Sequence, residues 1–126
     1  MGRYDDRSVT WPGGNDGQID DRERRVIRNE VLFREVNERI EEINAGASRS
    51  GLIEFLCECG EETCLDAVEL TREEYERVRS VSDHFVMRPG HEHADFERVI
   101  DSSDRCVVIK KVGLAEDVAD RNNPRI

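Results

Sequence analysis

The 126-residue sequence contains few apolar residues and no long apolar run. Hydrophobic residues make up 37% of the chain and charged residues 38%, so any core is modest and a metal ion or a partner would add stability that the core lacks. No stretch approaches the roughly 18 consecutive apolar residues of a membrane span. The amino-terminal residues 1–6 form no apolar signal core. We therefore expect one small domain, located in the cytoplasm and not bound to a membrane.

Basic charge is also scarce. The sequence has 19 Lys and Arg residues against 29 Asp and Glu residues, which gives a net charge of −10 at pH 7. A nucleic-acid partner is unfavourable because phosphates require a basic surface. Common catalytic signatures, such as G-x-S-x-G, H-E-x-x-H, a glycine-rich phosphate loop or P-C-x-x-C, are missing too. We expect a protein that is not an enzyme, and an enzyme with an open zinc site is the least favoured alternative.

What the sequence does contain is a tight cluster of cysteines. Three of the four cysteines, Cys57, Cys59 and Cys64, fall within eight residues. In a strand, Cys57 and Cys59 point to the same side, and the gap of four residues that includes Gly60 lets Cys64 return to them. In a reducing compartment, such clustering favours a metal site over disulfides. Three soft sulfur donors suit Zn²⁺, so we predict a structural zinc site.

A closed zinc site needs a fourth ligand. His91 leads, because the turn at Pro89-Gly90 can present the next side chain towards the cysteines. The spacing differs from that of a common zinc finger, which pairs two C-x-x-C type knuckles. The predicted ligands are Cys57, Cys59, Cys64 and His91. Three other donors stay open as alternatives for the fourth position: His93, His84 and Cys106.

The C-x-C opening of the cluster also resembles that of the small CDGSH iron–sulfur proteins, in which three cysteines and one histidine hold a [2Fe–2S] cluster. In those proteins the third cysteine lies further on and the histidine follows it closely. Here His91 comes 27 positions after Cys64. An iron–sulfur cluster is therefore a minor alternative to zinc.

A wider pattern combines a helix with the cysteine cluster and a Pro-Gly-His turn. Its segments are the run 28–40, Cys57-Glu58-Cys59, Cys64, Glu74-Tyr75-Glu76, Pro89-Gly90-His91 and Val107-Val108-Ile109-Lys110. In these segments the chain resembles small, functionally uncharacterised actinobacterial proteins, over about residues 28–125. The resemblance implies that His91 belongs with the three cysteines. It implies no activity and no substrate.

Hydrophobic periodicity predicts an α+β fold, with a long N-terminal helix, a small and mostly antiparallel sheet, one short helix and the zinc site at one end. We predict helices over 21–45 and 72–80, strands over 52–56, 67–70 and 84–88, and a hairpin over 98–110. Residues 1–20 are expected to form a disordered tail and residues 21–112 a single zinc-binding domain. Residues 113–126 are expected to form a C-terminal tail or a short terminal helix.

The predicted long helix carries an apolar stripe, with Asn29 in its one polar slot. The stripe consists of Val26, Phe33, Val36, Ile40 and Ile43. It either packs on its own sheet, in which case Asn29 needs an internal hydrogen bond, or it faces another chain. We expect the second arrangement, either as a homodimer through residues 21–45 or as docking to an unidentified protein partner. The predicted partner-binding residues are Val26, Asn29, Phe33, Val36 and Ile40.

Together these features predict a small cytosolic zinc-binding protein that acts as a protein-interaction or regulatory adaptor, with zinc in a structural role. The alternative is a thiol-based redox or metal sensor. In that case oxidation of the clustered cysteines would eject the ion and unfold the platform that it holds.

Overall fold

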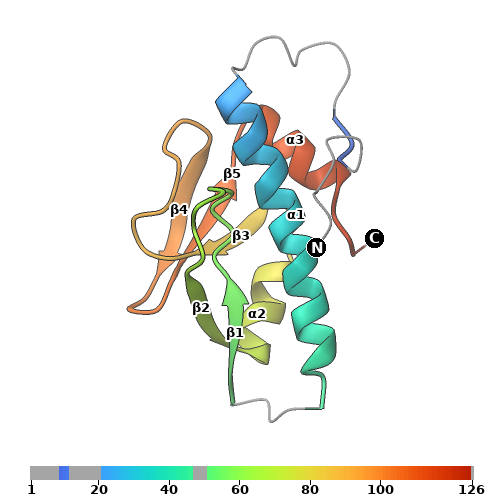
Figure 1. The fold of residues 1–126 in the computed structure, drawn as a ribbon, viewed down its shortest axis with the longest axis vertical. Coiled ribbons are helices and arrows are strands. Elements are labelled where there is room, and N and C mark those ends of the chain that lie inside the picture. Colours follow the sequence, from blue (N-terminus) through green and yellow to red (C-terminus); the bar gives the residue numbers. More distant parts are fainter. Residues whose placement is uncertain (1–8, 12–20, 47–50, 126) are drawn as a thin grey trace.

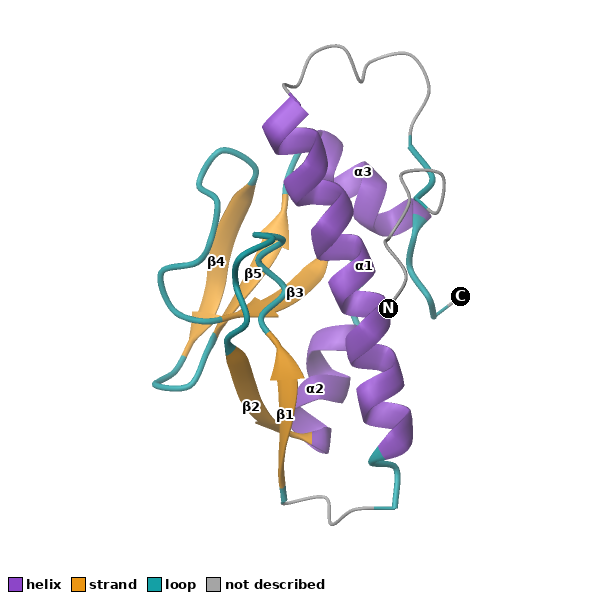
Figure 2. Ribbon diagram, in the orientation of Figure 1, coloured by secondary structure: helices purple, strands orange, loops and turns teal. Residues whose placement is uncertain are grey.

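The computed structural model describes residues 9–11, 21–46 and 51–125. Its helices and strands follow one another as α1 (Asp21–Ile43), β1 (Leu52–Leu56), β2 (Ala67–Thr71), α2 (Arg72–Arg79), β3 (His84–Met87), β4 (Glu97–Ser102), β5 (Val107–Lys111) and α3 (Leu114–Arg121). The long helix α1 lies along one side of the strands (Figure 1). The strands pair in the antiparallel direction and the helices lie beside them (Figure 2), so the predicted α+β class is confirmed.

The strands form two small antiparallel sheets. One sheet consists of β1 and β2, and the other has β5 at its centre between β3 and β4. The sheets meet just beyond β1, where the Glu58 N–H donates to the Val86 carbonyl of β3 at 2.9 Å. The chain that leaves β1 therefore runs directly to the edge of the second sheet, and this stretch contains the cysteine cluster.

The core forms where alternate strand residues meet the helices. In β5, Val107, Ile109 and Lys111 are buried while the residues between them are half-exposed. In β1, the buried Phe55 ring stacks on the Tyr75 ring of α2, with 4.3 Å between ring centroids. This stacked pair packs α2 against the first sheet.

The buried face of α1 is mixed. It contains the apolar side chains of Val26, Ile27, Val31 and Leu32, and four polar side chains at helical spacing: Glu30, Arg34, Asn37 and Glu41. The apolar stripe lies at the border of this face: Val26 is buried, Phe33, Val36 and Ile40 are half-buried, and Ile43 is 82% exposed. None of the described helices combines the length and the apolar character needed to cross a bilayer.

Two of these polar side chains tie α1 to distant parts of the chain. The Arg34 guanidinium donates to the carbonyls of Ala119 and Asn122, at 2.9 Å each, and so caps the end of α3. The Asn37 amide accepts from the Leu56 N–H at 2.8 Å and donates to the Leu56 carbonyl at 3.0 Å. Because buried polar groups are costly without partners, these bonds fix where α3 and β1 meet the helix.

A buried ion cluster ties α1 to the three-stranded sheet. The Lys111 ammonium contacts the carboxylates of Glu30 and Glu97, and all three side chains are at most 1% exposed. Burial raises the pKa of Glu30 well above its ordinary value. Burial acts on Glu97 in the same direction, but hydrogen bonds from Glu30 and Lys111 outweigh it and lower the pKa of Glu97. The two shifts run in opposite directions, as expected for two buried carboxyl groups that share one ammonium.

The folded unit extends beyond residue 112, where the sequence analysis placed the end of the domain. The residues expected to form a tail or a short terminal helix form α3, and its Ala115, Val118 and Ala119 side chains are buried. They belong to the same core as the strands. The C-terminal stretch therefore contributes to stability.

Three residues of the expected N-terminal tail also pack on the domain. Val9 is 5% exposed, and the Thr10 N–H donates to the Asn122 side chain at 2.7 Å. The Arg24 guanidinium lies 4.1 Å from the centroid of the Trp11 ring. For residues 9–11 the expectation of disorder is therefore wrong, because they bury apolar surface against the core. The other residues of the expected tail lie outside the described part of the chain.

Substitution of Asn37 by Leu tests the polar face of α1. The change removes the two hydrogen bonds to Leu56 and a third, at 2.8 Å, to the Glu58 carboxylate. We expect the free energy of unfolding, measured by urea titration, to fall by about 3 kcal/mol, because buried groups lose their partners. The matched control Arg39→Leu, at an exposed position of the same helix, should change it by less than about 0.5 kcal/mol. A loss below about 1 kcal/mol for Asn37→Leu would contradict this role.

Candidate metal centre

The end of β1 positions the first two cysteines. Cys57 and Cys59 are buried, Cys64 is half-buried, and all three are free thiols. They follow the end of β1, where Glu58 and Cys59 lie in a turn; the sulfurs of Cys57 and Cys59 belong to the ligand set, whereas the Glu58 carboxylate is buried against Arg79. The chain then turns, with the Cys64 N–H donating to the Glu61 carbonyl at 3.1 Å, and brings the third sulfur back.

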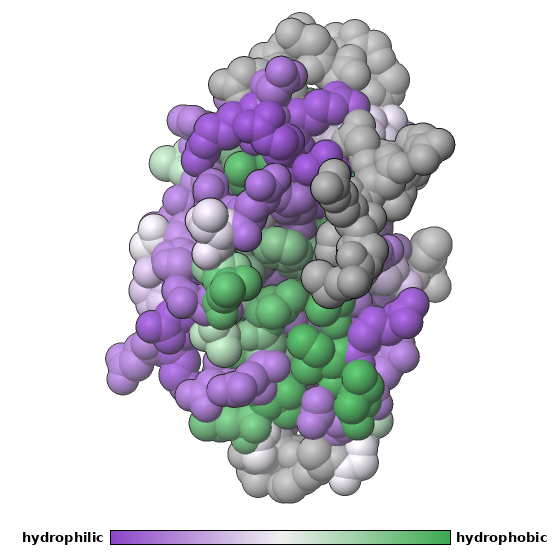
Figure 3. Space-filling view, viewed as in Figure 1, coloured by the Kyte–Doolittle hydropathy of each residue, from purple (hydrophilic) through white to green (hydrophobic). Residues whose placement is uncertain are grey.

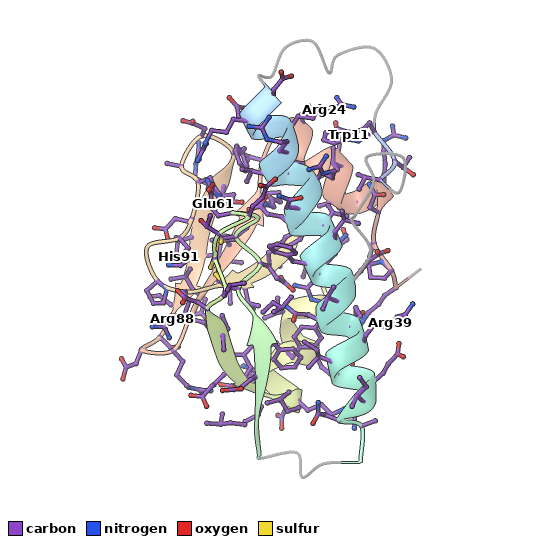
Figure 4. All side chains as sticks on the ribbon, in the orientation of Figure 1. Trp11, Arg24, Arg39, Glu61, Arg88 and His91 are labelled. Atoms are coloured by element: carbon purple, nitrogen blue, oxygen red, sulfur yellow. The ribbon has the colours of Figure 1, made fainter. Side chains whose placement is uncertain are left out.

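His91 reaches the cysteines from the loop between β3 and β4. The turn before it is closed by the His91 N–H, which donates to the Arg88 carbonyl at 3.1 Å. Gly90 has a φ of +87°, a conformation in which a side chain would be strained. In Figure 4, His91 and Arg88 lie beside the loop that contains the sulfur atoms. The predicted Pro-Gly-His turn therefore presents the imidazole to the cluster.

The four predicted ligands lie together, as the sequence predicted. The imidazole Nδ1 of His91 is 3.4 Å from the Cys57 sulfur and 3.6 Å from the Cys64 sulfur. All four ligand atoms, including the Cys59 sulfur, lie within 4.8 Å of one another. Zinc–sulfur and zinc–nitrogen bonds of about 2.3 and 2.05 Å in a tetrahedron separate the two ligand atoms by roughly 3.5 Å. The spacing therefore fits one metal ion.

The alternative fourth ligands point elsewhere. The His93 ring donates from Nε2 to the Cys59 carbonyl at 2.7 Å and stacks on Phe96. His84, at the start of β3, lies 3.9 Å from the Asp83 carboxylate. Cys106 is buried just before β5 and is not among the clustered ligands. His93 forms a second group of potential ligands with Glu30 and Glu97, but the Lys111 ammonium already supplies the positive charge between those carboxylates.

Backbone groups act on all three sulfurs. The Arg88 N–H donates to the Cys57 sulfur at 3.2 Å. The backbone of Glu61 acts to lower the pKa of Cys59, and the backbone of Asp66 acts in the same direction on the pKa of Cys64. Hydrogen bonds of this kind favour thiolate over thiol, and thiolate is the form that binds metal.

The three thiols differ in acidity because they share protons. The hydrogen bond from Cys57, assisted by the Glu61 N–H and His91, lowers the pKa of Cys59 to about 5 against the effect of burial. The same hydrogen bond, together with burial, raises the pKa of Cys57. Burial raises the pKa of Cys64. The shared proton thus lowers the pKa of one thiol of the pair and raises that of the other, and the charge of a bound ion would deprotonate all three.

Asp66 lies behind His91 and sets which ring nitrogen faces the cluster. Its carboxylate is 3.6 Å from Nε2 of His91, while Nδ1 faces the sulfurs. A proton on Nε2 is favoured by the carboxylate and leaves Nδ1 free to bind a metal. The sequence analysis did not identify Asp66, because nothing in the sequence distinguishes it from the other surface carboxylates.

Glu58, between the first two cysteines, holds the ligand segment to the core. Its carboxylate is fully buried and pairs with the Arg79 guanidinium at 3.1 Å. The same carboxylate accepts from the Val86 N–H at 3.0 Å and from the Asn37 amide at 2.8 Å. No role for Glu58 was predicted from the sequence, because its partners Arg79, Val86 and Asn37 are distant along the chain.

Gly60 lets the ligand loop lie directly on α1. It has a φ of +77°, and a Cβ at this position would come within 2.4 Å of the Val26 carbonyl. The Gly60 carbonyl accepts from the Asn29 amide at 2.9 Å. Val26 and Asn29, which were predicted to bind a partner, therefore contact the loop that follows β1 in their own chain. Asn29 has the internal hydrogen bond expected if the helix packs on its own domain.

One side of the site opens to solvent. A hollow of about 450 Å³ is lined by Cys64, His91 and their neighbours. At its rim, Arg22 of α1 pairs with Glu61 at 3.0 Å. The hollow makes the Cys64–His91 side of the cluster the accessible one, whereas Cys57 and Cys59 face the interior.

Comparisons of the chain with protein-family models, curated proteins and solved structures gave no match.

Replacing Asp66 by Asn tests the support of His91. The variant loses the charge that favours a proton on Nε2, so the zinc affinity, measured by competition with a chromophoric chelator, should fall about tenfold. The control Glu62→Gln changes a neighbouring exposed carboxylate and should leave the affinity unchanged. Equal affinities for Asp66→Asn and the unsubstituted protein would show that this carboxylate does not support the ligand.

Proposed function

We propose that the chain is a small zinc-binding protein in which Cys57, Cys59, Cys64 and His91 hold one Zn²⁺. The observation that carries the proposal is the convergence of three sulfurs and one imidazole nitrogen within 4.8 Å. Three thiolates and an imidazole suit zinc in number and in softness. A [2Fe–2S] cluster would spread the same ligands over two irons, so the compact set favours a single ion.

The proposed role of zinc is structural. Four protein ligands complete a tetrahedron and leave no position for water or substrate, which is the arrangement of structural zinc sites. The ligands join the segment after β1 to the loop after β3, so a bound ion would add a link to the hydrogen bonds that already connect this segment to β3. An enzyme that needs an open coordination position is accordingly the least favoured alternative.

The zinc-held fold is proposed to act as a protein-interaction or regulatory adaptor in the cytoplasm. Support comes from the border of α1, where Phe33, Val36 and Ile40 are half-buried and Ile43 is exposed. This apolar border could receive a second copy through residues 21–45 or another protein. The net charge of −10 disfavours a nucleic acid as the partner.

A second candidate function is a thiol-based redox sensor, and the solvent-facing position of Cys64 favours it. Hydrogen peroxide would take two electrons from the Cys64 thiolate, giving a sulfenic acid and hydroxide. A neighbouring cysteine thiolate would then displace hydroxide from that sulfur and form a disulfide. The ion would lose two of its four ligands and leave.

Metal content tests the structural site. We expect about one equivalent of zinc per chain, and less than about half an equivalent in Cys64→Ala and His91→Ala. Removal of zinc by a chelator should unfold the domain or lower its melting temperature, because structural zinc contributes ~10–16 kcal/mol, comparable to a whole domain stability of about 5–15 kcal/mol. Cys106→Ala, which changes a cysteine outside the cluster, should keep its zinc. Zinc below half an equivalent in the unsubstituted protein, or stoichiometric iron with visible colour, would contradict the proposal.

Zinc release by hydrogen peroxide separates the sensor from the adaptor. In a sensor, micromolar peroxide should release zinc, detected with a chromophoric chelator, and a thiol reductant should restore binding. The Cys106→Ala variant should respond identically. Zinc retained at millimolar peroxide would exclude the sensor and leave the adaptor.

A further inference from the structure

An apolar face runs across α1 and β1. We call it the α1–β1 face, and it consists of Phe33, Val36, Ile40, Ile43, Leu52 and Leu56. Ile43 is 82% exposed and Leu52 is 54% exposed, and the other four are half-buried. Figure 3 shows apolar surface gathered over the C-terminal half of α1 and over β1.

The two elements form one continuous face because β1 is fastened beside α1. The side chain of Asn37 binds both backbone groups of Leu56. Ile53 and Phe55 point into the core, so Leu52 and Leu56 point outward on the opposite side of the strand. Apolar surface gathered across two elements marks an interaction site more often than single exposed residues do.

Carboxylates border this face. Four exposed glutamates lie on its two elements and on the paired strand β2: Glu35, Glu42, Glu54 and Glu69. Glu54 and Glu69 lie opposite each other in the β1–β2 ladder. Arg39 is an exposed basic residue on the same half of α1. The acidic border therefore matches a partner that combines apolar and basic side chains.

Another contact of α1 shows how such a basic side chain docks. A groove of about 620 Å³ along the helix is lined by Glu38, Glu41 and Arg125, and it reaches Glu35 and Val36. Arg125 lies 2.9 Å from a Glu38 oxygen and 2.6 Å from a Glu76 oxygen. The carboxylates of α1 thus already accept one arginine from within the chain.

We infer that the α1–β1 face binds a basic amphipathic helix of a partner protein. The inference rests on the proposed adaptor role and names its partner class. Apolar side chains of the partner at i, i+3, i+4 and i+7 pack on the face, and its Lys and Arg side chains reach the carboxylate border. The helical part of the face, from Phe33 to Ile43, is about 15 Å long, which corresponds to about three turns of a docked helix.

A second copy of the chain fits this face less well. It would carry its own net charge of −10 and its own four border glutamates to the interface, and like charges brought together oppose association. Asn29, one of the predicted partner-binding residues, is engaged with Gly60 of its own chain.

The test uses zinc-loaded full-length protein and a synthetic helical peptide of about 14 residues, built from Leu and Lys with Leu on one face. The control peptide has the same composition in an order that gives no apolar face. We expect the amphipathic peptide to bind at least tenfold more tightly in a fluorescence anisotropy titration, because only it matches the apolar surface. Equal binding of the two peptides would overturn the inference in favour of non-specific attraction.

Matched variants locate the binding. Ile43→Glu on the face should weaken binding at least tenfold, whereas Val99→Glu, at a 44% exposed position on β4, should change it less than twofold. Glu42→Lys with Glu54→Lys should weaken it at least tenfold. Asp95→Lys with Asp104→Lys, two exposed aspartates with the same change in net charge, should weaken it less than threefold. Equal weakening of peptide binding by Ile43→Glu and Val99→Glu, or by the two double variants, would overturn the inference.

Zinc content and molar mass are measured on every sample. Peptide binding that fails in protein with one zinc per chain overturns this inference and leaves the structural zinc site standing, whereas protein without zinc contradicts the proposed function itself. Light scattering should give the monomer mass of 14.5 kDa. A dimer that Ile43→Glu dissociates would assign the face to a second copy and overturn the inference.

Discussion

The buried carboxylate of Glu58 is the contact on which the arrangement of the domain depends. It accepts hydrogen bonds from α1 through Asn37, from α2 through Arg79 and from β3 through Val86. Its neighbours on both sides are ligands of the candidate metal centre. Because Arg79 is itself only 2% exposed, neither charge can lose the other without leaving an unpaired ion in the interior. The geometry of the cysteines is therefore fixed from the core side.

Buried polar side chains that have partners also hold α1 in place. A chain with 37% hydrophobic residues cannot cover this helix with apolar contacts alone, and paired polar side chains supply the remaining contacts. Glu30 reaches β5, Arg34 caps α3, and Asn37 fastens β1. Such bonds are directional, so they specify one packing of the helix where a purely apolar face would tolerate several. The apolar residues left at its border are consequently available for contact with other molecules.

Local features were predictable from the sequence, and features that depend on distant partners were not. The cysteine spacing and the Pro89-Gly90 turn were enough to predict the cluster, because both act over a few residues. The short strands and the helix over 72–80 were predictable for the same reason. The inward polar face of α1 was not, because Arg34 finds its partners 85 and 88 positions away. The periodicity of apolar residues, which is the usual signal for the buried face, therefore indicated the border of the helix.

The two segments of the candidate metal centre are 27 positions apart, between Cys64 and His91, and the chain between them contains β2, α2 and β3. A bound ion would close this stretch into a ring through its coordination bonds. While the ion stays bound, such a ring has fewer partly unfolded conformations than an open chain, so the ion would stabilise these three elements even where it does not contact them. It would also make them open and close as one cooperative unit. Loss of the ion would then destabilise this ring first, at a distance from the ligands themselves.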